Sequence, residues 1–408
     1  MRIQAFQGLR PTPERAPEVA SLPYDVVSTE EARELAAGNP LSFLHVVRAE
    51  IDLPPGTDPY DASVYAQAKS NFERLQTLDV LVREPEPCLY LYELEMLGRR
   101  QRGLVTACHI EDYENDVIKK HEKTRQAKED DRTRLNATLS AHPGPVFLTY
   151  RDRPEINALV QRTCEEAPFI EFAAPDGVRH RIWRIPGGGD FPHAFSSVPV
   201  AYVADGHHRS ASAARVGGER RVNNPNHTGE EPYNWFLAVA FPASELNILA
   251  YNRVVADLNG LQPAELLQAL AGLDGIEKMT DEAAAIPARP GEVAFYLDGK
   301  WRSLTFAPSL SDDPAASLDV ARLQDVVLSP LLGVGDPRTD SRIDFVGGIR
   351  GTDYLETQVN DGKAGIAFSM HPVTVEALMS IADAGKIMPP KSTWFEPKLR
   401  SGLFVHTF

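Results

Sequence analysis

The turn at residues 205–209, with the sequence Asp-Gly-His-His-Arg, constrains the fold of this 408-residue chain more than any other segment. An apolar run at 198–203 precedes it and is typical of a buried strand. An alanine-rich stretch at 210–215 follows it and favours a helix. Because Gly206 is free to adopt a tight turn, the pattern predicts a strand that passes directly into a helix.

The residue types at this turn indicate an anion site. The first backbone N–H groups of a helix attract negative charge, and histidine and arginine side chains add cationic donors. We therefore expect phosphate groups to bind at Gly206, His207, His208 and Arg209. Asp205 carries the opposite charge, which suits a bound Mg²⁺ ion or the acceptance of a proton from a hydroxyl. The alternative is an ordinary Asp-Gly turn with solvated side chains.

A second candidate region, at residues 119–134, is locally basic. It holds seven lysine or arginine residues and four acidic ones, whereas the whole chain has a formal net charge of −15. A basic stretch within an acidic chain suits an anionic ligand such as a nucleotide. On the residues alone, an exposed helix with salt bridges between successive turns is an equally good interpretation.

Hairpins alternate with scattered helices along the chain, which favours an α+β fold over a regular βαβ series. A capping box at Ser28 and Glu31 predicts a helix over 29–39, and helical spacing predicts another over 59–78. Paired apolar runs around short turns predict three hairpins, at 88–110, 169–185 and 292–306. Further strands are expected at 146–150, 198–203, 235–241, 246–255 and 366–370, and further helices at 119–142 and 373–384.

Composition limits the classes of function. The acidic balance disfavours a nucleic-acid-binding protein, whose phosphate contacts need a basic face. Cys88, Cys108 and Cys164 show no Cys-x-x-Cys spacing, so neither a disulfide framework nor a zinc site is indicated. We find no signal-peptide pattern and no apolar run of membrane-spanning length. We therefore expect a cytoplasmic protein with neither a nucleic-acid nor a membrane partner.

Several motifs distributed along the chain carry a family resemblance. They are Pro-Tyr-Asp-Val (23–26), Asn-Pro-Leu-Ser-Phe-Leu (39–44), His-Glu-Lys-Thr (121–124), Lys-Glu-Asp-Asp-Arg (128–132), the turn at 205–209, and Met-Pro-Pro-Lys-Ser-Thr-Trp-Phe-Glu-Pro-Lys (388–398). Together they resemble a bacterial family catalogued as a domain of unknown function, family ten-fifteen. The turn itself resembles the signature of free serine kinases, a branch of the ParB/sulfiredoxin-like fold in which it holds nucleotide phosphates. Segment 128–132 departs from the family pattern by an extra acidic residue, which blurs the alignment of its aspartates.

The resemblance implies a ParB/sulfiredoxin-like core at 87–257, with a helical and irregular segment at 1–86 before it. A shift toward alanine and proline marks the start of an α+β region at 258–408. The implied activity is phosphoryl transfer from ATP or ADP to the hydroxyl of a small molecule, with free L-serine as the leading acceptor.

The resemblance also implies roles for individual residues. By similarity to an early His-Glu segment of the serine kinases, Glu122 is the implied general base. His121 and Lys123 beside it are expected to help bind the nucleotide. Asp205 is expected to act in catalysis by orienting Mg²⁺ or the hydroxyl.

The sequence leaves two alternative functions, the role of one segment and the oligomeric state open. A ParB-like pocket is also compatible with a nucleotide-binding switch that regulates a partner. A sulfiredoxin-like repair enzyme is a weaker alternative, because it needs a cysteine where this chain has His207. The segment 391–395, between two prolines, is either a lid over the site or a tail that anchors the core. Nothing in the sequence indicates an oligomeric state.

Overall fold

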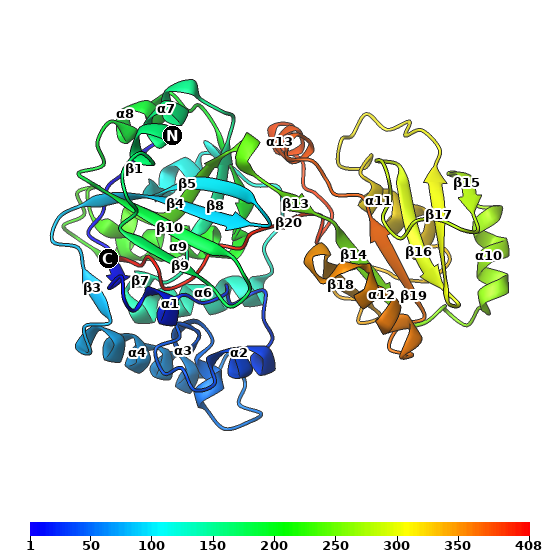
Figure 1. The fold of residues 1–408 in the computed structure, drawn as a ribbon, viewed down its shortest axis with the longest axis horizontal. Coiled ribbons are helices and arrows are strands. Elements are labelled where there is room, and N and C mark those ends of the chain that lie inside the picture. Colours follow the sequence, from blue (N-terminus) through cyan, green and yellow to red (C-terminus); the bar gives the residue numbers. More distant parts are fainter. The chain divides into compact units, whose positions relative to one another are not determined.

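The computed structural model describes residues 1–408 and divides the chain into two units. The first unit contains Met1–Leu246 and the returning segment Pro397–Phe408, and the second contains Asn247–Glu396. Both marked ends of the chain therefore belong to the first unit (Figure 1). None of the helices combines the length and the apolar character that crossing a membrane requires.

A nine-stranded mixed sheet forms the centre of the first unit. Its strands are β1 (Ile3–Gln4), β4 (Cys88–Met96), β5 (Arg99–His109), β6 (Ile118–Lys119), β8 (Val146–Tyr150), β9 (Ile170–Ala173), β10 (Arg179–Pro186), β11 (Ala201–Asp205) and β12 (Trp235–Pro242). Eight of them follow the order β6-β11-β8-β12-β5-β4-β10-β9, and β1 pairs with β5. Inner strands such as β8 are buried along their whole length, which explains their continuous apolar sequences.

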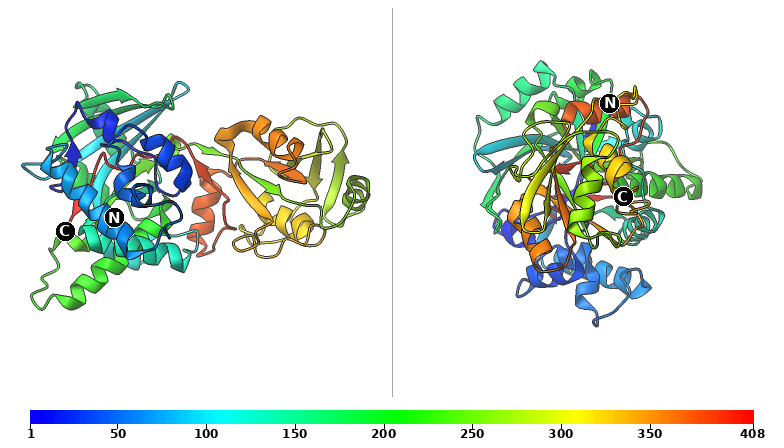
Figure 2. Two further views of the ribbon diagram at one scale, coloured as in Figure 1. Left: turned by 90° about the horizontal axis from the view of Figure 1, so that it is seen from below. Right: turned by 90° about the vertical axis from the view of Figure 1, so that its right-hand side faces the viewer.

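Helices cover this sheet, and α9 is the one that begins at the turn. The helices are α1 (Ala16–Val19), α2 (Thr29–Ala36), α3 (Leu44–Val47), α4 (Ala62–Thr77), α5 (Ile110–Glu114), α6 (Gln126–Leu139), α7 (Pro154–Thr163), α8 (Phe191–Ser196) and α9 (His207–Asn223). α9 packs against α6, which in turn packs against α4. Figure 2 shows the far end of α9 and the loop after it projecting from the rest of the first unit.

Short elements complete the first unit and tie its ends together. They are β2 (Leu9–Pro11), β3 (Leu81–Arg83), β7 (Ala141–His142), β21 (His406–Thr407) and the short 3-10 helices Ala49–Asp52, Pro232–Asn234 and Ala243–Glu245. β2 pairs with β3, and β21 pairs with β7. Backbone bridges also join Ser21 to Ser401 and Leu9 to Val405. The last residues of the chain are therefore built into the first unit rather than into the region that precedes them.

Most of the expected elements of the first unit are present, but one expected helix begins later in the chain than predicted. The capping box at Ser28 and Glu31 begins α2, and α4 occupies the second expected helix. The expected helix over 119–142 instead contains β6, then a loop at 120–125, and only then α6. Pairing with a strand that is distant in the sequence explains this difference. β6 pairs with β11, so the first residues of this region form a strand of the sheet instead of a helix.

The division of the chain also differs from the expected boundaries after residues 86 and 257. The structure divides the chain after Leu246 instead. Residues 1–86 belong with the sheet because β1 pairs with β5. Residues 397–408 belong there as well, through the bridges and the β21–β7 pair.

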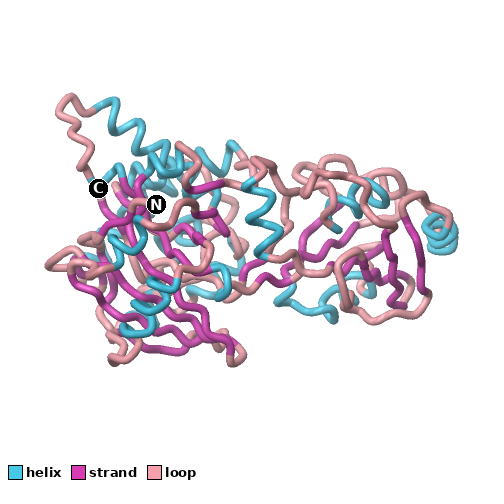
Figure 3. Tube along the Cα trace, turned by 90° about the horizontal axis from the view of Figure 1, so that it is seen from above, coloured by secondary structure: helices cyan, strands magenta, loops and turns pink.

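An antiparallel sheet of six strands organises the second unit, in the order β15-β17-β16-β19-β14-β18. Its strands are β14 (Tyr251–Val255), β15 (Ile276–Thr280), β16 (Glu292–Leu297), β17 (Lys300–Phe306), β18 (Ile343–Gly347) and β19 (Ile366–Met370). The helical segments are α10 (Pro263–Ala271), α11 (Asp319–Leu323), the π-helical Gln324–Leu328, the 3-10 helix Gly348–Arg350, α12 (Gly351–Asn360) and α13 (Val375–Asp383). Figure 3 distinguishes the strands of the two sheets from their helices and loops. The expected hairpin at 292–306 corresponds to β16 and β17.

The proline-bracketed segment 391–395 packs within the second unit. Its strand β20 (Trp394–Phe395) pairs with β13 (Ile248–Leu249). The ring of Trp394 lies 5.1 Å from that of Tyr251 and sits directly over Gly347, where a Cβ atom would come within 2.5 Å of it. These contacts attach the segment to the second unit, as expected for an anchoring tail.

Histidines buried in the first unit are held without charge. His142 and His406 face each other on β7 and β21, with ring centroids 5.7 Å apart, and each is 4% exposed. Burial lowers the pKa of His406 to about 4 and that of His142 well below its usual value. Neither ring nitrogen of His142 has a hydrogen-bond partner. Both residues therefore favour the folded state only while they remain neutral.

We predict that acidification lowers the free energy of unfolding between about pH 6.5 and 4. Unfolded histidines bind protons below about pH 6.5, whereas the folded state keeps His406 neutral down to a pKa of about 4. The stabilisation is therefore complete above pH 6.5 and is lost as the pH falls, on the order of 3 kcal/mol for this residue. Urea denaturation at a series of pH values measures the effect.

His142→Leu is the matched variant for this experiment. It removes one buried histidine without breaking a hydrogen bond, so its stability is expected to depend less steeply on pH than that of the wild type. A wild-type free energy of unfolding that does not change over this pH range would contradict the prediction. So would an unchanged slope in His142→Leu.

Candidate functional site

The turn between β11 and α9 has the geometry that its sequence predicts. β11 ends at Asp205 and α9 begins at His207, with Gly206 between them in a left-handed conformation at φ +93°. A Cβ atom on Gly206 would lie 3.0 Å from Nε of Arg209. Both the backbone conformation and this close approach require glycine, so the turn is specified by that one residue.

The start of α9 presents backbone N–H groups that lie ahead of its helical hydrogen bonds. No side chain caps this 17-residue helix. The first hydrogen bond within the helix runs from the amide of Ser210 to the carbonyl of Gly206. The backbone N–H groups before Ser210 therefore make no hydrogen bond of the helical i to i−4 type. These amides carry the positive end of the helix dipole. The arrangement is suited to a phosphate group.

Asp205 lies between two cations. Its Oδ2 atom is 3.2 Å from Nζ of Lys398, and its Oδ1 atom is 3.5 Å from Nη2 of Arg209. Burial raises the pKa of Asp205, but the attraction of Lys398 and Arg209 outweighs burial and lowers it overall. Asp205 therefore stays ionised at neutral pH and is a poor proton acceptor. A Mg²⁺ ion on this carboxylate would compete with both cations, so the geometry favours an anchoring role for Asp205.

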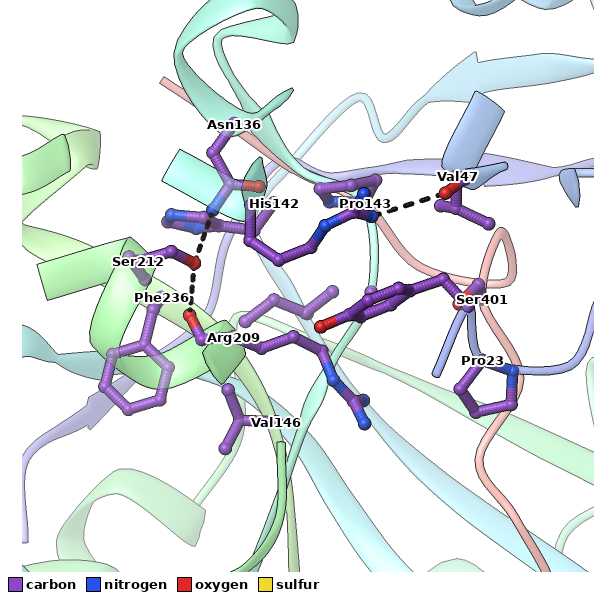
Figure 4. Close-up of a pocket in the computed structure, with 15 residues that line it drawn as sticks. Pro23, Val47, Asn136, His142, Pro143, Val146, Arg209, Ser212, Phe236 and Ser401 are labelled. Carbon is purple, nitrogen blue, oxygen red and sulfur yellow. Dashed lines mark hydrogen bonds between the residues drawn. The ribbon is translucent and has the colours of Figure 1, made fainter. Parts of the chain in front are cut away.

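Arg209 links the turn to two other segments. Its Nη2 atom is 3.4 Å from the carboxylate of Asp25, and its Nη1 donates to the carbonyl of Pro145. Figure 4 shows the Arg209 side chain among the residues that line a small cavity of about 20 Å³, which has room for one water molecule and not for a nucleotide. The guanidinium therefore has partners within the protein, and a bound phosphate would share it with Asp25 and Asp205.

The loop after β6 brings His121 and Glu122 to the turn. β6 runs parallel to β11, with Ile118 opposite Ala201, so the two strands end at the same edge of the sheet. The rings of His121 and His207 are perpendicular, with centroids 4.5 Å apart. One nitrogen of each ring and a carboxylate oxygen of Glu122 all lie within 4.8 Å of one another. Residues predicted from two separate motifs thus meet in one place.

Burial changes the roles expected for the histidines. His121 and His207 are 2% and 6% exposed. Burial lowers the pKa of His121 to about 4 and that of His207 well below its usual value. At neutral pH neither ring is charged, which corrects the expectation that His207 adds a cationic donor for phosphate. Nε2 of His208 accepts a hydrogen bond of 3.0 Å from the backbone N–H of Arg125, so His208 positions the loop before α6.

The remaining basic residues of 119–134 do not gather at the turn as one anion site. Lys128 lies over the ring of Tyr60, with its ammonium 5.4 Å from the centroid. Arg132 lies over the ring of Tyr24 at 4.0 Å. These cations attach α6 to the N-terminal segment, which agrees with the alternative interpretation that their role is structural. Lys123 is exposed on the loop beside Glu122.

Sequence reasoning did not select Lys398 and Asp25. Both lie in segments that carry the family resemblance, but their partners are far away in the chain. Lys398 is only 8% exposed. The local sequence gives one indication, because Lys398 lies at the start of an apolar tail and a buried lysine is almost always paired with an opposite charge.

The cysteines give no support to the sulfiredoxin-like alternative. Cys88 and Cys108 are buried on β4 and β5, and Cys164 follows α7. Burial raises the pKa of all three thiols. Protonated thiols are weak nucleophiles, and none of these residues belongs to the turn or to the loop after β6.

Comparison with solved structures finds limited similarity. SbnI with a C-terminal truncation, from Staphylococcus aureus, matches at 9% identity and a TM-score of 0.38, over 73% of this chain and 85% of that chain. A free serine kinase in complex with AMP matches at 11% identity and a TM-score of 0.35, over 71% and 86%. A conserved hypothetical protein from Pyrococcus furiosus matches at 12% identity and a TM-score of 0.34, over 73% and 93%. Similarity at this level carries no argument about activity.

Comparison with curated proteins and with family models gives a different kind of result. No curated protein matches the chain. One family model, described as "Protein of unknown function (DUF1015)", matches residues 3–321. This range includes the loop after β6, the turn and α9, and it confirms the family expected from the sequence motifs. The chain belongs to the DUF1015 family.

Proposed function

We propose that the first unit binds the phosphates of ATP or ADP at the start of α9 and transfers a phosphoryl group to the hydroxyl of a small molecule. One observation carries the proposal: the carboxylate of Glu122 lies within 4.8 Å of a ring nitrogen of His207, the first residue of a helix whose start has no side-chain cap. The amides suit a phosphate group, and the carboxylate suits the proton of an attacking hydroxyl. The resemblance of the turn to the free serine kinases favours free L-serine as the acceptor, with O-phosphoserine as the product.

The proposed step transfers one phosphoryl group and one proton. The acceptor oxygen forms a bond to the terminal phosphorus of the donor, and the bond from that phosphorus to the bridging oxygen breaks. The donor leaves as ADP or AMP, and the hydroxyl proton passes to Glu122. Bound Mg²⁺ would neutralise phosphate charge in the donor. Most of the acceleration in such reactions comes from positioning and electrostatic stabilisation, which the amides of α9 would supply.

Glu122 is better placed than Asp205 to take this proton. Both oxygens of Asp205 face cations, Lys398 and Arg209, which hold the carboxylate in its ionised form. Glu122 lies beside His121 and His207, whose rings burial keeps neutral. A lowered pKa makes Asp205 a weak base, whereas Glu122 is the carboxylate that the resemblance to the serine kinases implies for this role. We therefore propose Glu122 as the general base and Asp205 as the anchor for the cations.

Product analysis tests the activity itself. The purified protein is incubated with Mg²⁺, ATP or ADP, and a pool of small hydroxylated metabolites that includes L-serine. Mass spectrometry is expected to detect a phosphorylated acceptor, and omission of that acceptor is expected to stop nucleotide turnover. Nucleotide binding without any phosphorylated product would contradict the proposal and would favour a nucleotide-binding switch.

We predict that Glu122→Gln lowers turnover by at least about a hundredfold while nucleotide affinity changes little. The amide keeps the shape of the side chain but accepts no proton at neutral pH. Glu73→Gln is the matched control, because Glu73 is an exposed glutamate on α4 and its replacement is expected to leave turnover unchanged. Steady-state rates and calorimetric titration with nucleotide measure the two quantities. Full activity in Glu122→Gln at saturating acceptor would remove Glu122 from the base role.

We predict that Arg209→Ala weakens nucleotide binding by about tenfold to a hundredfold, because a charge-assisted contact with phosphate contributes about 1.5–3 kcal/mol. Arg220→Ala is the control on the same helix, since Arg220 lies near the far end of α9 and bonds Ser140. Because Arg209 also bonds Asp25 and Pro145, thermal denaturation must first show that the variant is folded. A folded Arg209→Ala that binds ATP as tightly as the wild type would exclude Arg209 from the phosphate site.

A further inference from the structure

Three side chains at the site form a cluster of metal-ligating groups that the proposed phosphoryl transfer does not use as a unit. His121, Glu122 and His207 each present one ligand atom, and the three atoms lie within 4.8 Å of one another. Ligand atoms around a tetrahedral zinc ion are about 3.3 Å apart. Metal binding would therefore require these three side chains to draw closer together, and Glu122 is the only one of them that is partly exposed.

Two buried ring nitrogens in the cluster have no hydrogen-bond partner. They are Nδ1 of His121 and Nε2 of His207. Buried polar atoms in folded proteins are almost always satisfied, so two unpartnered nitrogens in one cluster are candidates for a shared partner such as a metal ion. A neutral imidazole has one nitrogen with a free lone pair, so each ring can offer one ligand atom to a metal ion.

The backbone orients one of these rings. The imidazole of His121 also hydrogen-bonds the backbone of Val203, on β11. Histidines that bind metal ions typically use their second nitrogen in this way, which fixes the ring and its tautomer. Nδ1 of His121 is the unpartnered atom, so it is the nitrogen that we assign as the metal ligand.

We propose that His121, Glu122 and His207 bind a divalent transition-metal ion, with Zn²⁺ as the best match to the ligands. Two imidazole nitrogens and one carboxylate oxygen form a common zinc ligand set, whereas Mg²⁺ prefers oxygen ligands alone. Three protein ligands leave a fourth position open for water or for an oxygen of a bound molecule. This site differs from the magnesium site expected at Asp205, which contributes no ligand to it.

The proposed metal site stands independently of the phosphoryl transfer. Where both operate, the metal ion and the acceptor proton compete for the same carboxylate of Glu122. Bound Zn²⁺ would then prevent Glu122 from accepting the proton of the acceptor hydroxyl.

Zinc titration of the full-length protein tests the site. After treatment with a chelator, the wild type is expected to bind one Zn²⁺ ion per chain in isothermal titration calorimetry. His121→Gln, Glu122→Gln and His207→Gln are each expected to weaken binding by at least about tenfold. His193→Gln is the control, because His193 is exposed on α8 and is expected to bind zinc as the wild type does.

Two further measurements make the test decisive. Co²⁺ in place of Zn²⁺ is expected to give visible absorption bands of a four-coordinate site in the wild type, and these bands are expected to disappear in Glu122→Gln. Glu122 lies on a partly exposed loop, so this variant disturbs the folded core least, and circular dichroism without metal verifies its fold. Absence of stoichiometric zinc binding by the wild type, or binding unchanged in the folded Glu122→Gln, would overturn the proposal. Neither readout requires turnover, so failure of the metal site is distinguishable from failure of the proposed kinase activity.

Discussion

The ion pair between Asp205 and Lys398 ties the start of α9 to the returning C-terminal segment of the first unit. The Lys398 side chain is 9% exposed and that of Arg209 is 10% exposed, so both cations are largely withdrawn from water. Removal of one partner from such a cluster leaves a buried charge without compensation, which is far more destabilising than the loss of a surface salt bridge. Asp25 and Pro145 complete the cluster through Arg209. One set of charges thereby joins four distant segments of the chain around the turn.

Much of the fold was predictable because its signals are local. Gly206 between an apolar run and an alanine-rich run specified the turn, and Ser28 with Glu31 specified the start of α2. The helix expected from residue 119 failed because β6 pairs with β11, a contact that the local sequence does not encode. The boundaries failed for the same kind of reason, since the tail at 397–408 returns to the first unit.

The sequence indicated which residues lie together at the candidate site better than it indicated their charge states. The motifs selected His121, Glu122 and His207, and the structure brings these three together. Their burial depends on the surrounding sheet and helices, so the loss of charge on both rings was not visible in the sequence. Lys398 was missed because its partner, Asp205, lies far away along the chain. Residue types at the motifs therefore indicated which side chains meet, while burial decides whether the two rings carry charge.

The position of Lys398 has a consequence for the order in which the protein is made. The second unit, Asn247–Glu396, is inserted between Leu246 and Pro397, so a ribosome completes all of it before it adds Lys398. Until then Asp205 and Arg209 are present in the nascent chain without the lysine that neutralises the aspartate in the finished protein. A chain truncated anywhere within the second unit therefore has the turn but cannot assemble its charge cluster. Translation must therefore pass through the whole second unit before Lys398 can join this cluster.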